Sequence, residues 1–274
     1  MSSAGFNPIT SVVKTKIKRF LCGVKLYHLK KIKVGAVSYL NTKPLLYGIK
    51  RSTLMDKIEL IEEYPAKIAQ MLLDDEIDIG LVPVAIIPKL KEAHIITNFC
   101  IGSEGEVASV CLFSEVPMEK IERVLLDYQS RTSVNLVKIL LREYWQKNVV
   151  FEEATTDFRS QIKGTTAGVV IGDRAFEQRL ISPNIYDLAE AWKAFTGLPF
   201  VFAVWVANKP LNKDFIDAFS IANGYGITHI DEVIAENICD NYDLKTYYTE
   251  NISYDLTDEK RKGLALFLSK LSIN

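Results

Sequence analysis

Short apolar runs alternate along the chain with segments in which apolar residues recur at helical spacing. Within residues 65–73, for example, Ile68, Met71 and Leu72 fall on one face of a predicted helix. Strands separated by such helices are typical of α/β proteins with a parallel-type sheet. The strands predicted in this first series are residues 32–37, 58–61, 77–82 and 107–113.

A second series of predicted elements follows. A helix over residues 132–144 carries Leu136, Ile139 and Leu140 on one face, and the apolar run 200–207 predicts a further strand. Residues 214–274 predict consecutive helices without further strands. Because such helices cannot bury their apolar faces alone, we expect this tail to return and cover the first series. The other strands predicted here are residues 124–127, 149–151 and 167–171.

This order of elements predicts two lobes joined by two crossings, with a ligand held between them. The crossings are expected near residues 114–119 and 198–204. The predicted fold is therefore α/β with a cleft between lobes. The predicted parts are an N-terminal extension (1–31), a discontinuous first lobe (32–116 and 203–274) and a second lobe (117–202).

Composition and charge favour a globular protein that binds a small molecule. The 274 residues are 48% hydrophobic and 24% charged, which disfavours disorder. At roughly 150 residues per domain, this length suggests about two domains. The 33 Lys and Arg residues against 34 Asp and Glu residues leave a net charge of −1, so we do not expect nucleic acid as a partner.

The cysteines and the N-terminal segment favour a cytoplasmic protein. The cysteines lack C-x-x-C spacing, which predicts neither a zinc knuckle nor a disulfide framework. The apolar run 20–24 after several basic residues is shorter than the roughly 7–15 residues of an export signal, and no segment reaches the roughly 18–20 of a membrane span. We interpret residues 1–31 as an extra helix or a mobile tail, with a peripheral membrane anchor as the alternative. The four cysteines are Cys22, Cys100, Cys111 and Cys239.

The turn after the first predicted strand brings polar side chains to the start of a helix. Tyr39 and Asn41 lie in the loop, and Pro44 suits the first helical turn with Asn41 or Thr42 as its cap. Unpaired N–H groups at a helix start favour an anionic ligand. A plain capped turn with ordinary loop residues is the alternative.

A second strand-to-helix turn, residues 127–133, gathers three hydroxyls and a guanidinium. Together with the N–H groups of the helix start, these groups suit a carboxylate. The alternative makes Ser130 or Thr132 a helix cap and Arg131 a surface residue. We favour an anion site, since two such turns in two lobes face one cleft. The candidate ligands are Ser130, Arg131, Thr132 and Ser133.

Other polar segments add candidates but no cofactor motif. Gly172 and Asp173 form a third turn, where Asp173 is either a cap or a ligand group. A loop ending near Ser109 lacks the glycine spacing of ATP or NAD sites. The acidic run 74–76 indicates a solvated turn or, as the alternative, a metal cluster. The three histidines have no metal-ligand spacing, so we expect no metal or organic cofactor, and catalysis must depend on carboxylates, hydroxyls, electrostatics or the substrate itself.

Five segments, in their order and spacing, resemble the chorismate dehydratase family of the futalosine route to menaquinone. The resemblance covers about residue 32 to the C-terminus, and its most specific part is TGLPF at 196–200. The segments are GAVSYLNTKPL (35–45), EVASV (106–110), DYQSRTS (127–133), GD (172–173) and DLAEAWKAFTGLPFVFAVW (187–205).

The resemblance implies a two-lobed, periplasmic-binding-protein-like fold of type II that acts as a lyase in the cytoplasm. Chorismate would lose water to give 3-[(1-carboxyvinyl)oxy]benzoate. The family's active-site residues would fall on Asn41 and Ser109, with Thr132 and Ser133 as carboxylate ligands. The remaining substrate-binding candidates are Tyr39, Ser130, Arg131, Gly172 and Asp173.

Chorismate is a dianion, and the two helix starts would supply two carboxylate receptors. Asn41 would orient the substrate or the departing hydroxyl, and Ser109 would donate to a carboxylate. Because no histidine base is apparent, the proton acceptor would be the substrate's own enolpyruvyl carboxylate, with Asp173 or Glu106 as alternatives.

Three other functions stay open. The related 1,4-dihydroxy-6-naphthoate synthase of the same pathway is disfavoured by the SYLNT (38–42) and TGLPF runs. A non-catalytic small-anion-binding protein shares the fold, although the absence of an export signal counts against it. A ligand-sensing regulatory domain would need a DNA-binding segment, which is not apparent. The oligomeric state is left open.

Overall fold

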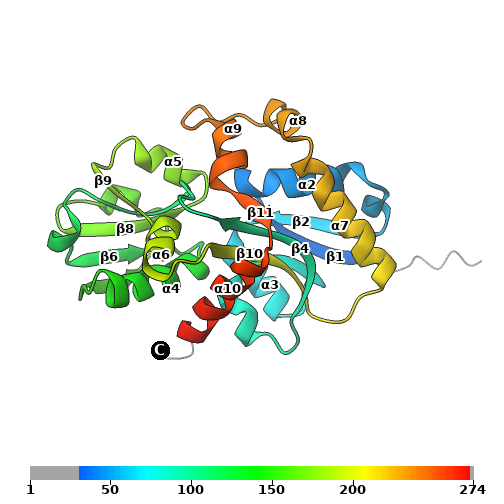
Figure 1. Ribbon diagram of the computed structural model, residues 1–274, viewed down its shortest axis with the longest axis horizontal. Helices are drawn as coiled ribbons and strands as arrows, with labels where there is room; N and C mark the ends of the chain where they lie inside the picture. The colour runs from blue at the N-terminus through cyan, green and yellow to red at the C-terminus, as the bar shows by residue number, and fades with distance from the viewer. Residues whose placement is uncertain (1–30, 272–274) are drawn as a thin grey trace, which may run out of the picture. The chain divides into compact units, whose positions relative to one another are not determined.

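Two mixed β-sheets, each with helices on both sides, form the part of the chain that the computed structural model describes, residues 31–271 (Figure 1). The strand order is β11-β4-β10-β3-β1-β2 in the six-stranded sheet and β7-β6-β8-β5-β9 in the five-stranded sheet. Within the described range, residues 32–271 belong to one compact unit. The extra helix, tail or membrane anchor considered for the N-terminal extension falls on residues outside the described range.

The six-stranded sheet has a parallel half and an antiparallel half. β1 pairs in parallel with β2 and β3, whereas β10 runs antiparallel between β3 and β4, and β11 pairs with β4 at the edge. The prediction of a parallel sheet therefore holds only for its first three strands. The prediction that no strand follows residue 214 is wrong, because β11 completes the edge. The strands are β1 (Ile32–Val37), β2 (Ile58–Glu63), β3 (Ile79–Pro83), β4 (His94–Ser103), β10 (Phe200–Ala207) and β11 (Ser253–Asp255).

The five-stranded sheet buries side chains on both faces. Along β5, Cys111 and Phe113 join a small apolar cluster on one face, whereas Leu112 joins the main core on the other. This alternation is the two-residue period of a strand. β6 is parallel to β7 and β8, and β5 is antiparallel to β8 and β9. The strands are β5 (Val110–Ser114), β6 (Arg123–Leu126), β7 (Val150–Glu153), β8 (Thr166–Ile171) and β9 (Asn184–Asp187).

The C-terminal helices return to the six-stranded sheet, which confirms the expected role of the tail. α7 packs against α2 and β4, and α10 packs against β10. Figure 1 shows α2 and α7 on one side of this sheet and α3 and α10 on the other. The helices here are α2 (Lys43–Arg51), α3 (Pro65–Leu73), α7 (Lys213–Ile227), α8 (Ile230–Ala235), α9 (Leu244–Thr246), α10 (Asp258–Leu271) and the π-helix η7 (Tyr247–Asn251).

Helices also cover the five-stranded sheet. The helix predicted over residues 132–144 is confirmed as α4 followed by the π-helix η5. α4 packs against β8, and α5 and α6 pack against β5. The helices are α4 (Thr132–Ile139), η5 (Leu140–Tyr144), α5 (Arg174–Arg179) and α6 (Leu188–Thr196). Short 3₁₀ turns elsewhere are η1 (Leu40–Thr42), η2 (Thr53–Asp56), η3 (Val84–Lys89), η4 (Met118–Lys120) and η6 (Arg159–Gln161).

The chain passes between the sheets twice. It leaves the six-stranded sheet after β4 and returns through Gly197 and Pro199 into β10. Gly197 ends α6 in the left-handed conformation at φ 75°, which explains a glycine there. The first change of sheet was expected near residues 114–119, but β5 already lies in the five-stranded sheet. The change therefore precedes residue 110. Within the strand predicted over residues 107–113, the first three residues form the connection between the sheets, and β5 begins only at Val110.

Candidate functional site

A cavity that opens to solvent, with about 500 Å³ of space including its open mouth, lies among the loops and strand ends that join the two sheets. Asp, Glu, Lys, Arg and His are absent from the described residues that line it, so its polar groups are hydroxyls, one amide and backbone. The polar lining is Tyr39, Asn41, Ser130, Thr132 and Ser133. The remaining lining is Val37, Pro65, Pro83, Ile101, Val107, Val110, Ile171, Gly172, Phe202 and Ala203.

The β1 wall of this cavity consists of Tyr39 and Asn41, in the turn that follows β1. The backbone carbonyl oxygen of Asn41 accepts a hydrogen bond from the Tyr254 hydroxyl at 3.0 Å. The backbone N–H of Leu40 donates to the Asp173 carboxylate at 3.0 Å. The turn predicted from residues 35–45 thus lies at the cavity, but partners far along the chain hold it there.

The α4 wall consists of Ser130, Thr132 and Ser133. The Ser130 hydroxyl accepts the N–H of Ser133 at 3.0 Å and so caps the helix start. Thr132 accepts from the backbone of Ala85 and donates to the carbonyl of Phe202 at 3.1 Å, which ties α4 to the six-stranded sheet. Within residues 31–271 the Ser133 hydroxyl has no hydrogen-bond partner in the structure. It is therefore the hydroxyl of this wall most available to a ligand.

Arg131 stands apart from the other candidates of this turn. Its side chain is exposed, donates to the carbonyl of Ser130 at 3.2 Å and does not line the cavity. Arg131 thus occupies a surface position, as the alternative interpretation of this turn had it. The anion-binding capacity of the α4 wall thus consists of hydroxyls and helix N–H groups.

Contacts across the cavity join the two walls. The Tyr39 hydroxyl donates to the side-chain oxygen of Gln129. The backbone carbonyl of Gln129 accepts the N–H of Ala66 at 3.1 Å. The ring of Tyr39 lies against Gly172, where a Cβ atom would come within 2.6 Å of the ring. Gly172 also has φ 65°, a conformation that favours glycine. Burial raises the pKa of Tyr39, so its hydroxyl is a neutral donor.

Asp173 holds the β1 wall rather than lining the cavity. Its carboxylate accepts the N–H of Leu40. Burial raises the pKa of this carboxyl group, although the hydrogen bond from Leu40 acts in the opposite direction. Glu106, the other carboxylate considered as a base, pairs with Arg179 at 2.6 Å and lies outside the cavity lining.

An ion pair with a buried carboxylate stabilises the turn that precedes α4. The Asp127 carboxylate is completely buried, accepts the N–H of Gln129 at 3.0 Å and pairs with Arg174 at 2.6 Å. Burial raises the pKa of Asp127, while the guanidinium of Arg174 acts in the opposite direction. The Nε and one Nη atom of Arg174 are buried without a described partner.

Ser109 lies between the lining residues Val107 and Val110 in the chain; its own side chain is completely buried and does not line the cavity. Its hydroxyl accepts a hydrogen bond from the Tyr247 hydroxyl at 2.8 Å. Its carbonyl accepts the N–H of Gly172 at 2.9 Å. Ser109 therefore connects the cavity region to both the C-terminal segment and the third predicted turn.

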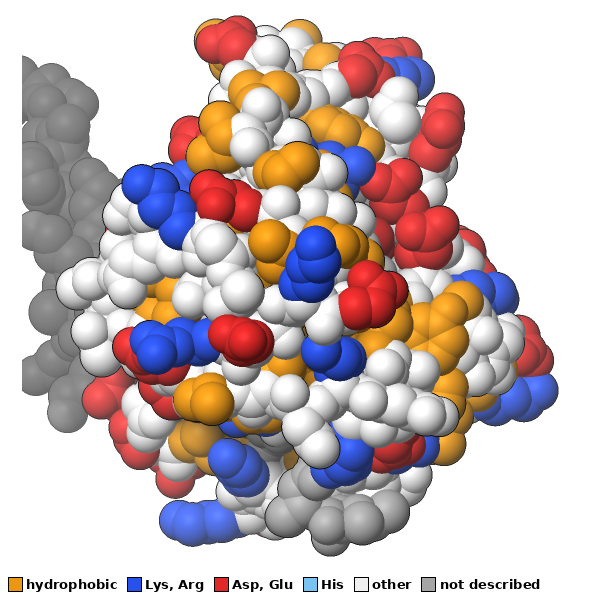
Figure 2. Space-filling view, turned by 90° about the vertical axis from the view of Figure 1, so that its left-hand side faces the viewer, with side chains coloured by type: hydrophobic (Ala, Val, Ile, Leu, Met, Phe, Trp, Pro, Cys, Tyr) orange, Lys and Arg blue, Asp and Glu red, His pale blue; other side chains and the backbone are white. Residues whose placement is uncertain are grey.

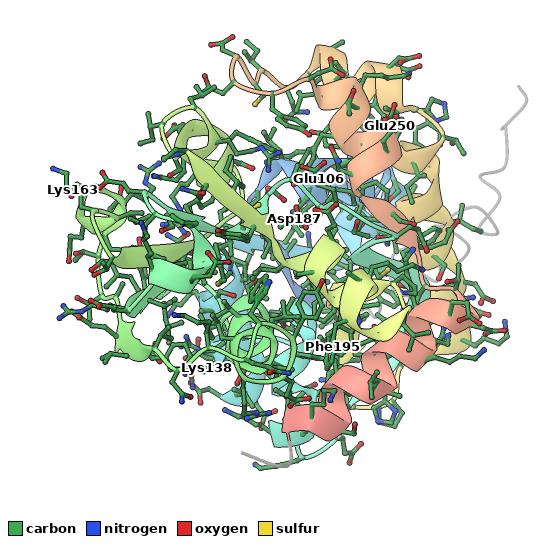
Figure 3. All side chains as sticks on the ribbon, turned by 60° about the vertical axis from the view of Figure 1, so that its left-hand side comes forward. Glu106, Lys138, Lys163, Asp187, Phe195 and Glu250 are labelled. Atoms are coloured by element: carbon green, nitrogen blue, oxygen red, sulfur yellow. The ribbon has the colours of Figure 1, made fainter. Side chains whose placement is uncertain are left out.

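Asp187 anchors the connection that carries Ser109. One carboxylate oxygen accepts the N–H groups of Val107 and Ala108, and the other accepts those of Ala189 and Glu190 at the start of α6. Figure 3 shows Asp187 beside Glu106 in the middle of the view. Burial raises the pKa of Asp187 to about 6, although these hydrogen bonds lower it.

The acidic run 74–76, considered above as a candidate metal cluster, lies in the turn that follows α3. Within residues 31–271, no group of three or more His, Cys, Asp or Glu side chains is placed to hold a metal ion, and this includes the acidic run 74–76. The helices of the same residues include none long and apolar enough to cross a membrane. On the face shown in Figure 2, basic and acidic side chains are interspersed.

Sequence reasoning missed several residues that support the site. Gln129, Arg174 and Asp187 lie inside or next to segments already singled out, so their position in the motifs was a usable signal. Tyr247 and Tyr254 lie in the C-terminal region, where no motif marks them. Their contacts with Ser109 and Asn41 arise only in the folded chain.

Solved structures share this fold at low sequence identity. A protein of Archaeoglobus fulgidus has a TM-score of 0.72 at 15% identity, covering 90% of this chain and 98% of that chain. The periplasmic aliphatic sulphonate binding protein SsuA of Escherichia coli has a TM-score of 0.59 at 15% identity, covering 89% and 91%. The chain therefore has the periplasmic-binding-protein-like fold that its motifs implied.

Sequence relatives cover most of the chain. A chorismate dehydratase of Thermus thermophilus is 27% identical over a 264-residue comparison, which covers 88% of this chain and 95% of the relative. A chorismate dehydratase of Campylobacter jejuni is 26% identical over a 239-residue comparison, which covers 83% of this chain and 92% of the relative. The family model described as menaquinone biosynthesis matches residues 32–272. The chain therefore belongs to the menaquinone biosynthesis family.

Proposed function

We propose that this protein is a chorismate dehydratase, a lyase that converts chorismate into 3-[(1-carboxyvinyl)oxy]benzoate and water in menaquinone biosynthesis. One observation carries the proposal. The cavity brings together Asn41 and the hydroxyls at the start of α4, from two motifs that resemble this family. The two relatives named as chorismate dehydratases, which cover most of the chain, support the same assignment.

Substrate binding in this proposal depends on neutral donors. A carboxylate of chorismate binds the α4 wall, where Ser130, Thr132 and Ser133 lie at a helix start. Arg131 stays outside this receptor because it does not line the cavity. The second carboxylate lies toward the turn after β1, where Asn41 orients the substrate or the departing hydroxyl.

The reaction removes a ring proton and the neighbouring hydroxyl. The C–H bond breaks first, and the ring carboxylate takes up delocalised charge that Ser109 stabilises as a donor. The C–O bond then breaks, and the hydroxyl leaves as water with the abstracted proton. Aromatisation drives this step, and the reaction needs no oxidant or reductant because no net redox change occurs.

The proton acceptor in this proposal is the enolpyruvyl carboxylate of the substrate. Asp173 is the weaker protein alternative because its carboxylate already accepts the N–H of Leu40. Glu106 is the weakest because Arg179 pairs with it outside the cavity lining. The buried free thiols Cys100 and Cys111 support a reducing, cytoplasmic site of action.

The test is to incubate the purified, chelator-treated protein with chorismate and to follow products by chromatography and mass spectrometry. We expect a product lighter than chorismate by one water. Binding of chorismate without turnover would favour a small-anion-binding protein instead. Absence of both binding and turnover would overturn the proposal, and the next assay would then be for 1,4-dihydroxy-6-naphthoate synthesis.

A further inference from the structure

The Tyr247 phenol lies at a junction of three separate parts of the chain. Tyr247 begins the π-helix η7, and its ring is completely buried. The ring packs edge to face on Phe176, with 4.9 Å between ring centroids. Its hydroxyl donates to the Ser109 hydroxyl oxygen at 2.8 Å. A π-helical turn shifts the register of the side chains that follow, and such turns are frequent at functional sites.

This hydrogen bond determines in which direction the Ser109 hydroxyl can donate its proton. A serine hydroxyl has one proton to donate and lone pairs that accept. Because Tyr247 donates to its oxygen, the Ser109 proton is free to point in another direction. Within residues 31–271 no group accepts this proton, and Val107 and Val110, which precede and follow Ser109 in the chain, line the cavity.

The same phenol also affects Asn41. The Asn41 side chain lies close enough to lower the pKa of Tyr247, although burial dominates and raises it. Tyr254, from the same C-terminal region, donates to the backbone carbonyl oxygen of Asn41 at 3.0 Å. The C-terminal region therefore contacts both residues on which the proposed reaction depends.

We propose that Tyr247 is a positioning residue, which holds the Ser109 hydroxyl so that its proton is directed toward a carboxylate of the substrate. The assignment rests on the proposed dehydratase function. Tyr247 does not itself line the cavity. It acts through Ser109, so its contribution depends on the Ser109 hydroxyl being present.

The adjacent Tyr248 provides a matched control. Its side chain is also buried, it belongs to the same π-helix, and its hydroxyl has no hydrogen-bond partner among the described residues. Tyr247→Phe and Tyr248→Phe therefore remove the same atom from neighbouring buried positions. Only the first removes a hydrogen bond to Ser109.

The experiment measures kcat and KM for chorismate in the wild type, Tyr247→Phe, Ser109→Ala, the double variant and Tyr248→Phe, with melting temperatures as a folding check. We expect Tyr247→Phe to lower kcat about tenfold with KM changed less than twofold. In the Ser109→Ala background the same change should alter kcat less than twofold. Tyr248→Phe should match the wild type.

Several results would overturn the assignment. Unchanged kcat in Tyr247→Phe, or an equal loss in both backgrounds, would show that Tyr247 does not act through Ser109. If Tyr247→Phe fails to fold, 3-fluorotyrosine at position 247 keeps the hydroxyl and alters its donor strength, and an unchanged kcat there would also overturn it. A wild-type protein inactive on chorismate would overturn the proposed function and this assignment together.

Discussion

The two walls of the cavity differ in the sequence distance of the contacts that fix them. In the α4 wall, the N–H of Gln129 bonds the Asp127 carboxylate and the N–H of Ser133 bonds the Ser130 hydroxyl, all within one turn of chain. In the β1 wall, the Asn41 carbonyl bonds Tyr254, 213 positions away. The start of α4 is thus capped by local hydrogen bonds, although Thr132 also ties it to Ala85 and Phe202, whereas the turn after β1 is held by a segment near the C-terminal end of the fold.

Because of this difference, we expect substitutions in the two walls to have different effects on binding and on turnover. Local contacts form with little loss of chain entropy, so substitution of a hydroxyl that makes no long-range contact, such as Ser133, should change binding without disturbing the rest of the site. Long-range contacts exist only when the C-terminal region is packed against the cavity. Substitutions in the β1 wall or its supports should therefore affect turnover most.

The strongest test of the β1 wall is Asn41→Ala. We expect kcat for chorismate to fall about a hundredfold, because a preorganised polar group at the reacting centre is lost. Steady-state kinetics at saturating chorismate measure this, with circular dichroism to show an unchanged fold. Unchanged turnover would remove Asn41 from the proposed mechanism.

Contact between the walls is tested by Gly172→Ala. The added Cβ would meet the Tyr39 ring, so we expect KM to rise about tenfold as the walls are held apart. Gly164→Ala is a matched control, because Gly164 also has a positive φ, 57°, but has no atom within 4 Å of an added Cβ. Equal effects of the two variants would attribute the loss to backbone strain rather than to contact between the walls.

The α4 wall is tested by Ser133→Ala, with Arg131→Ala as its neighbour outside the cavity. Loss of one hydrogen bond to a charged ligand corresponds to about 1.5 kcal/mol, so we expect KM to rise about tenfold or slightly more with kcat little changed. Arg131→Ala should change KM less than twofold. A larger effect of Arg131→Ala would mean that its charge contributes to the receptor.

The smallest expected effect concerns Asp187, which holds the connection leading to Ser109. Its pKa is raised to about 6 in the folded protein, so the folded state binds this proton more tightly than the unfolded state. Stability from this group is present at low pH and is lost as the pH rises from about 4 to about 6. We expect a loss of about 1 kcal/mol between pH 5 and 7 that Asp187→Asn abolishes.

Urea denaturation of both proteins at pH 5, 6 and 7 measures this difference. The substitution itself should lower stability at every pH, because an amide has one acceptor oxygen to face four N–H groups. A wild type that gains stability relative to Asp187→Asn as the pH rises would show that these hydrogen bonds outweigh burial.

Much of the site could be predicted from sequence because its polar groups cluster in short motifs. The turns around Asn41 and Ser133 both line the cavity, and Gly172 lies against the Tyr39 ring as a residue of the third turn. Arg131 shares its motif with Ser133 but lies outside the cavity. Neighbouring positions in a turn point in different directions, and sequence spacing alone does not fix those directions.

What the sequence by itself determined were the elements and motifs that depend on neighbouring residues. Apolar periodicity predicted strands such as β1 and β10 and the helix at residues 132–144, although not β4 or β9, and the glycine and cap positions predicted the turns, because these preferences act over a few residues. Only the tertiary structure decided that β5 joins the five-stranded sheet, that β11 closes the other sheet, and that Tyr247 meets Ser109. Those outcomes are set by packing between segments far apart in the chain, for which local sequence carries no signal.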